Sequence, residues 1–103
     1  VEHIHNSGIV HRDIKPENIM LDGRQPVSVK LVDFGIGREV TQERIREFSG
    51  TPEYHPPEVV QSLPHLGEPV DVWCLGIVLF VMLCGRLPFF GSELEEVSSK
   101  IVC

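Results

Sequence analysis

The sequence feature that most constrains the fold is an apolar run at residues 72–84, which contains no charged side chain. A membrane-spanning helix needs about 20 such residues, so this run is too short and no membrane span is expected. A run that is apolar on every side is typical of a helix surrounded by protein. We therefore predict a central buried helix that follows residues 68–71 and ends near Gly85.

The rest of the chain is predicted to form short elements. The first residues read as the end of a helix already under way, which stops at residues 6–8. Two β-type runs, 19–21 and 27–32, flank a turn signal and predict a small hairpin. Residues 33–66 read as one irregular segment rich in Gly and Pro, and Ser92 is placed to cap a last helix. The predicted fold class is mainly α with a small β-hairpin.

Charge and cysteine content limit the partners and the compartment. A net charge of -6 offers no basic field for a nucleic acid and suits a basic peptide or a ligand carried with magnesium. The cysteines Cys74, Cys84 and Cys103 are odd in number and lack CxxC spacing, which indicates reduced thiols. An intracellular protein is expected, in the cytoplasm first, with the nucleus left open.

Three short motifs occur in a fixed order. His11-Arg12-Asp13 opens a loop with Lys15 and Asn18, Asp33-Phe34-Gly35 follows after the predicted hairpin, and Pro56-Pro57-Glu58 comes later. In this order and spacing the set resembles the serine/threonine protein kinases over nearly the whole chain. The resemblance implies that residues 1–103 are a partial C-terminal lobe of the protein-kinase fold (α+β). The N-lobe and later C-lobe helices would lie outside this fragment, which is expected to be inactive alone.

The resemblance also implies the chemistry. Phosphoryl transfer spreads negative charge over the moving group, so cations must be placed there and an acceptor hydroxyl must be aimed in line. Asp13 would orient that hydroxyl and accept its proton, and Lys15 would balance the charge of the γ-phosphate. Asn18 and Asp33 would hold Mg²⁺, with ATP as the phosphate donor.

Five further residues receive supporting roles from the resemblance. Asp71 would hydrogen-bond the backbone of the catalytic loop. His11 and Phe34 would belong to an apolar stack between the two lobes, with Gly35 completing the motif. Glu58 would pair with an arginine that does not follow in this sequence.

The expected substrates are proteins that present serine or threonine. Lys15 after Asp13, together with residues 50–54, resembles the serine/threonine pattern, although dual specificity stays open. The Thr51 hydroxyl would bond Asp13 and Lys15; the alternative is that Thr51 is a phosphosite. Glu17 would hold a basic residue upstream of the target, and its alternative is an ordinary exposed glutamate.

Regulation is expected to involve the activation segment. Arg12 before Asp13 marks the class in which a phosphate on that segment neutralises the arginine. Glu47 stands where many relatives carry the phosphorylated threonine, so we predict that it partly replaces a phosphate. Ser49 or Thr41 as true phosphosites, or a solvated Glu47, are the alternatives. Residues 45–54 resemble the calmodulin-dependent group, near the death-associated kinases.

One alternative function remains open from the sequence. A truncated kinase or pseudokinase would use the same fold as a non-catalytic binding scaffold. The presence of Asp13, Lys15, Asn18 and Asp33 favours the enzyme, because a pseudokinase typically lacks one of these residues. Each residue alone has an ordinary structural explanation, so the interpretation depends on the complete set.

Overall fold

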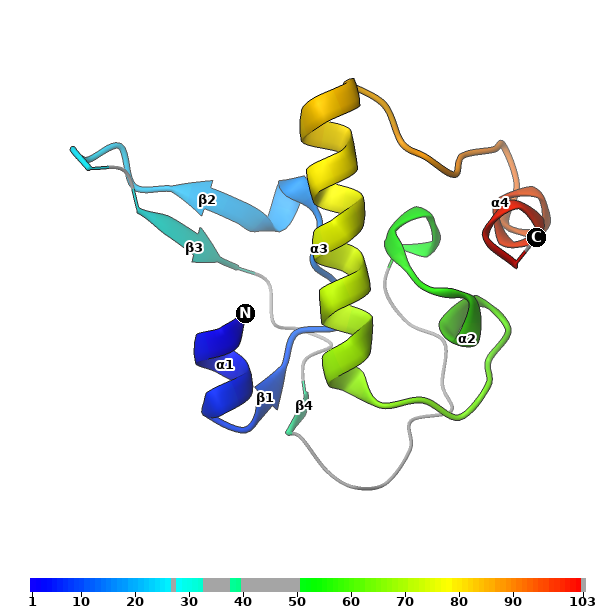
Figure 1. The fold of residues 1–103 in the computed structure, drawn as a ribbon, viewed down its shortest axis with the longest axis horizontal. Helices are drawn as coiled ribbons and strands as arrows, with labels where there is room; N and C mark the ends of the chain where they lie inside the picture. Colours follow the sequence, from blue (N-terminus) through cyan, green and yellow to red (C-terminus); the bar gives the residue numbers. More distant parts are fainter. Residues whose placement is uncertain (27, 33–37, 40–50, 103) are drawn as a thin grey trace.

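The fold consists of short elements arranged around one long helix in a computed structural model that describes residues 1–26, 28–32, 38–39 and 51–102 (Figure 1). In chain order the elements are α1 (Glu2–Asn6), β1 (Ile9–Val10), the 3₁₀ turn η1 (Pro16–Asn18), β2 (Ile19–Leu21), β3 (Val29–Leu31), β4 (Arg38–Glu39), the 3₁₀ turn η2 (Pro52–Tyr54), α2 (Pro57–Val60), α3 (Gly67–Cys84) and α4 (Leu94–Val102). The predicted class, mainly α with a small hairpin, is confirmed.

Helix α3 is the centre of the molecule, with α1 and the β2–β3 hairpin on one side and α2 and α4 on the other (Figure 1). It ends where predicted, because Gly85 adopts a left-handed φ of 72° and donates its N–H to the Val81 carbonyl at 2.8 Å. Its buried face joins residues from the loops and short helices in one core: Ile14, Tyr54, Val59, Val70, Cys74, Ile77 and Val78. Helix α4 buries Val97 and Ile101 and packs on η2 and α2.

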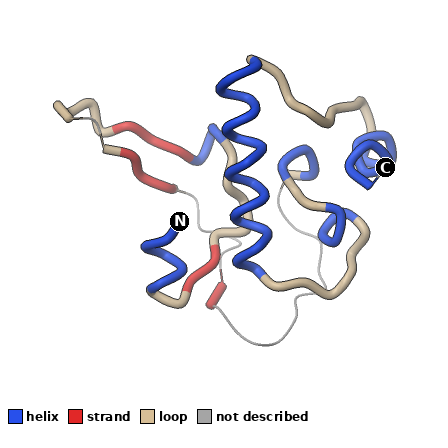
Figure 2. The backbone as a smooth tube through the Cα atoms, viewed as in Figure 1, coloured by secondary structure: helices blue, strands red, loops and turns tan. Residues whose placement is uncertain are grey.

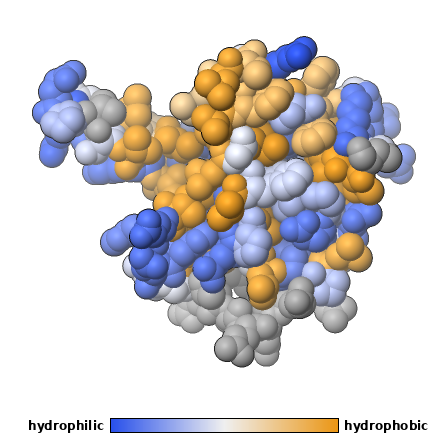
Figure 3. All heavy atoms as spheres, viewed as in Figure 1, coloured by the Kyte–Doolittle hydropathy of each residue, from blue (hydrophilic) through white to orange (hydrophobic). Residues whose placement is uncertain are grey.

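The opposite face of α3 is largely exposed in the part of the chain that the structure describes, so the cover by protein expected for so apolar a helix is only partly present here. Val72 is 60% exposed and Met82 73% exposed. An apolar groove of about 520 Å³ separates the hairpin from α3, with Ile19 on one wall and Leu79 on the other. Figure 3 shows apolar side chains gathered over the carboxyl end of α3 and the hairpin. The described elements are too few to cover so apolar a helix.

The hairpin forms as predicted. Strands β2 and β3 pair antiparallel with Ile19 opposite Leu31 and Leu21 opposite Val29. The Asp22 carboxylate accepts the N–H groups of Arg24 and Ser28, and these backbone hydrogen bonds hold the pKa of Asp22 below its ordinary value. An aspartate that bonds its own turn in this way is a common hairpin signal.

Other parts of the chain differ from the prediction: helix α3 begins at Gly67, before the residues expected to precede it. Ile9–Val10, read as part of a polar loop, is strand β1 and pairs with β4 in register Ile9 to Glu39 and Val10 to Arg38. The segment read as irregular contains η2 and α2, and both place a proline in their first turn. Proline suits the first helical position because an N–H at that position has no acceptor within the helix, so proline loses no hydrogen bond there. Turns this short contain too few residues to show a periodic pattern of hydrophobic side chains in the sequence.

Candidate active site

The loop between β1 and η1, which carries Asp13 and Lys15, runs beside helix α3 (Figure 2). Asp71 of α3 anchors this loop. The fully buried Asp71 carboxylate accepts the His11 N–H at 2.9 Å on Oδ2 and the Arg12 N–H at 2.8 Å on Oδ1. Arg12 has a φ of 74°, a left-handed conformation that costs a non-glycine residue about 1–2 kcal/mol. Hydrogen bonds to an ionised buried carboxylate are strong enough to offset that strain.

A third donor to Asp71 comes from α1. The Nε2 atom of His5 lies 2.8 Å from Asp71 Oδ2, and its Nδ1 lies 4.0 Å from the Glu68 carboxylate. Because Oδ2 of the ionised carboxylate accepts, His5 Nε2 carries the hydrogen and donates it. His5 was not predicted as a site residue, and the one sequence signal for it is its place in the helix before the loop.

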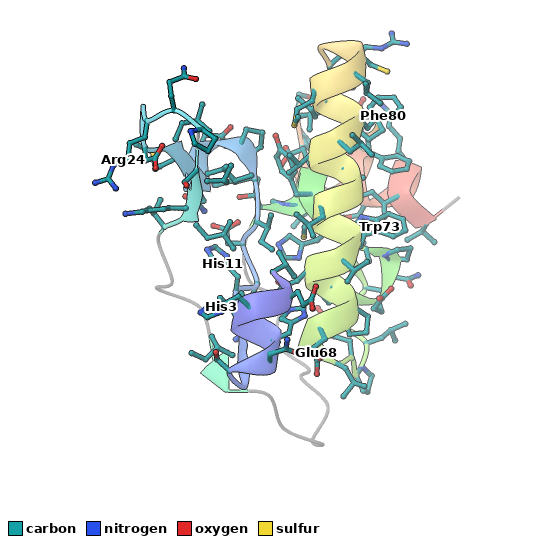
Figure 4. All side chains as sticks on the ribbon, turned by 60° about the vertical axis from the view of Figure 1, so that its left-hand side comes forward. His3, His11, Arg24, Glu68, Trp73 and Phe80 are labelled. Atoms are coloured by element: carbon teal, nitrogen blue, oxygen red, sulfur yellow. The ribbon has the colours of Figure 1, made fainter. Side chains whose placement is uncertain are left out.

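His11 links the loop to the end of strand β3. Its Nδ1 accepts the Asp13 N–H at 3.0 Å, so Nε2 carries the ring hydrogen and donates to the Val32 carbonyl at 2.8 Å. The Val32 N–H in turn donates to the Asn18 carbonyl at 2.9 Å. Figure 4 labels the His11 ring in this part of the molecule. Both backbone groups of Val32, the residue before Asp33, are therefore tied to the loop.

Asp13, Lys15 and Thr51 form a side-chain cluster that joins the loop to the segment after it. Thr51 Oγ1 donates to Asp13 Oδ1 at 3.1 Å and accepts from Lys15 Nζ at 2.8 Å. The ammonium of Lys15 lies 3.8 Å from Asp13 Oδ2. The Asp13 and Lys15 side chains are 16% and 23% exposed, so both remain open to a ligand while their positions are fixed.

Asn18 lies against Asp13 with its amide oxygen available. Its Nδ2 donates to the Asp13 carbonyl at 2.8 Å, with Asp13 Oδ2 at 3.5 Å. Within the described residues no hydrogen bond uses Asn18 Oδ1, a hard oxygen of the type that Mg²⁺ prefers. The donor set therefore fits a magnesium ligand at Asn18. The other predicted ligand, Asp33, lies outside the described residues, as do Phe34, Gly35 and Glu47.

The remaining predicted residues lie around this cluster. Glu17 is exposed on η1, and Glu58 on α2 lines a shallow pocket of about 290 Å³ with His65. Burial raises the pKa of Tyr54, and the nearby Glu17 and Glu53 carboxylates raise it further. Two carboxylates therefore act on the same phenol beside the cluster.

Two titratable side chains are buried in the core below the loop. Cys74 is fully buried, and burial raises the pKa of its thiol far above the ordinary value. Burial also lowers the pKa of His55 to about 4. Trp73 and Phe80 project from the same side of α3, above the pocket that they share with Phe89 (Figure 4).

Comparison with known proteins decides the family. The family model described as "Protein kinase domain" matches residues 1–103. The chain belongs to the protein kinase domain family. The described elements are a partial C-terminal lobe of the kinase fold, and α3 lies at the centre of these elements (Figure 1).

Named relatives support the same family. The carbon catabolite-derepressing protein kinase of Candida tropicalis is 44% identical over 102 residues, which cover 98% of this chain and 16% of that protein. Sperm motility kinase 2A of Mus musculus is 43% identical over 105 residues, covering 99% of the chain and 20% of that protein. Serine/threonine-protein kinase SIK1 of Rattus norvegicus is 42% identical over 103 residues, covering 99% and 13%. The chain spans at most about a fifth of these relatives.

Proposed function

We propose that the complete protein transfers the γ-phosphate of ATP to serine and threonine hydroxyls of protein substrates. The observation that carries this proposal is the cluster of Asp13, Lys15 and Thr51, with Asn18 bonded to the same aspartate. Kinase family membership and relatives named as serine/threonine kinases support the same reaction.

The cluster suits an in-line transfer. Asp13 Oδ2 has no hydrogen bond shorter than 3.5 Å among the described residues, so it is free to accept the proton of a substrate hydroxyl. As the substrate hydroxyl oxygen forms its bond to the γ-phosphorus, the bond between the γ-phosphorus and the β-phosphate oxygen breaks and ADP leaves. Lys15 supplies a positive charge two residues from the base, where charge builds up on the transferred group.

The proposed reaction also needs a magnesium ion, for which the chain offers two ligands. Asn18 and Asp33 would hold the ion, and Mg²⁺ when bound supplies charge neutralisation on the triphosphate. The bonds from Val32 to His11 and Asn18 fix the residue before Asp33 next to the other ligand.

Thr51 gives a direct test of the cluster. Thr51→Val removes the hydroxyl that bonds Asp13 and Lys15, so we expect kcat of the complete protein to fall about tenfold to a hundredfold, as for hydrogen bonds to charged groups. Steady-state kinetics on a serine peptide measure this change. Thr51→Ser keeps the hydroxyl and should stay within about threefold. Equal losses in the two variants would contradict the proposed role.

We also propose a preference for basic residues upstream of the target. Glu17 is exposed, Glu53 is half-buried, and neither forms an ion pair with a described residue. Replacing either by Gln should lower kcat/KM for an arginine-containing peptide about fivefold, as expected for an exposed ion pair, and leave an alanine-substituted peptide unchanged. A peptide library without enrichment of arginine or lysine upstream would exclude the preference.

Three further properties are proposals for the complete protein. The apolar run 72–84 was expected to be too short for a membrane span, but the whole helix Gly67–Cys84 has 18 residues and is long and apolar enough to cross a membrane by length and composition. We favour a core helix, because its Asp71 holds the catalytic loop.

An intracellular location is proposed because Cys74 and Cys84, the described cysteines, are free thiols. Glu47 as a partial substitute for a phosphate also remains a proposal.

A further inference from the structure

A buried histidine outside the kinase motifs lies beside the catalytic loop. His55 follows η2 directly and its side chain is 1% exposed. The phosphoryl transfer proposed above does not use it. A buried titratable side chain next to an active site is unusual enough to suggest a role.

The backbone connects His55 rigidly to Thr51. The Tyr54 N–H donates to the Thr51 carbonyl at 3.0 Å, and the His55 N–H donates to the Pro52 carbonyl at 3.1 Å. Two prolines, Pro56 and Pro57, continue the chain with fixed φ. Thr51 and His55 are thus the two ends of one tight turn, and η2 packs against α3. Movement of the His55 ring out of its site would move the Thr51 hydroxyl.

The surroundings of His55 favour its uncharged form. Charged and titratable groups act on it from the loop (Arg12, Asp13), from α3 (Asp71) and from the segment before α3 (His65). The two carboxylates favour a protonated ring, but burial outweighs them and lowers the pKa of His55 to about 4. At neutral pH the ring is therefore neutral while it is buried.

We propose that His55 is a positioning residue, whose buried ring keeps the turn that carries Thr51 seated on the catalytic loop. A charge at this position would have to leave the core, and the Thr51 contacts with Asp13 and Lys15 would open. This inference rests on the proposed function for its effect on activity, and on the geometry alone for its effect on the turn.

The turn itself can be tested without catalysis. In the open state His55 titrates near its ordinary value of 6.5, and in the closed state near 4. The closed turn is therefore fully favoured above pH 6.5 and loses stability as the pH falls toward 4. Hydrogen exchange of a peptide containing Tyr54 in the complete protein, corrected for intrinsic rates, should show the opening equilibrium rising about tenfold from pH 7.5 to 5.5. His55→Leu should remove this rise, and His3→Gln, at an exposed histidine, should keep it.

Kinetics at pH 7.5 give the second readout. His55→Leu should keep kcat within about threefold, and His55→Lys should lower it at least tenfold in a folded protein. Parental kcat in His55→Lys, or equal losses in both variants, would overturn the proposal. If His55→Leu does not fold, His55→Gln replaces it in the exchange assay, and a tenfold rise in that variant would also overturn it. Failure of the proposed function would instead appear as activity that does not depend on Asp13, with the exchange result unaffected.

Discussion

Replacing Asp13 by Asn in the complete protein should lower kcat by about 10²–10⁴-fold, the range for loss of a general base. The amide keeps an oxygen that can accept the Thr51 hydroxyl, so the cluster holds its shape. The amide of Asn, however, cannot accept a proton from the substrate hydroxyl. Single-turnover transfer of labelled phosphate from ATP to a serine peptide measures the change, and KM for ATP should vary little.

Asp22→Asn is the matched control for Asp13→Asn. Asp22 closes the hairpin turn and takes no part in the cluster, and Asn is also suited to such turns. Its kcat should equal that of the parent. A phosphate transfer rate unchanged in Asp13→Asn would remove Asp13 from the chemistry, whereas no transfer by the parent protein would favour the binding scaffold.

Replacing Asp71 by Asn should destabilise the complete protein by about 3–5 kcal/mol, the usual cost of breaking a buried charged network. The carboxylate accepts N–H groups from His5, His11 and Arg12. An amide has one acceptor oxygen, so its own NH₂ would face at least one of these donors. Without the two backbone bonds the strained φ of Arg12 has little to hold it, and kcat should fall as well. Urea unfolding followed by circular dichroism gives the free energy.

Glu68→Gln provides the comparison on the same helix. The Glu68 side chain is 49% exposed and lies 4.0 Å from His5. The unfolding free energy of the Glu68→Gln variant should stay within about 0.5 kcal/mol of that of the parent protein, as for most surface changes. A similar small change in Asp71→Asn would show that the buried carboxylate is not what holds the loop.

The parts of the fold that were predictable have strong local patterns. The apolar run predicted α3, and Gly85 its end, because only glycine takes a left-handed φ without strain. The turn signal at residues 22–26 predicted the hairpin. Proline-initiated turns such as α2, and the two-residue pairing of β1 with β4, have no comparable pattern. A two-residue ladder depends on tertiary placement more than on propensity.

The site was predictable only through the resemblance. Asp71 and Arg12 are 59 residues apart, and no spacing rule relates them without the kinase motifs. Single histidines are the hardest to interpret. The role of His5 depends on its contact with Asp71, and the role of His55 depends on its burial; both arise only once the chain has folded. The segments that cover α3 were also not predictable, because apolarity indicates a need for burial and does not show which segments meet it.

The most direct measurement is a crystal structure of the complete protein with Mg²⁺ and a non-hydrolysable ATP analogue. We predict a magnesium ion bound by Asn18 Oδ1 and the Asp33 carboxylate, with the terminal phosphate next to Lys15 and within reach of a hydroxyl held by Asp13. A nucleotide bound elsewhere, with Asp13 and Asp33 on different surfaces, would contradict the proposed phosphoryl transfer.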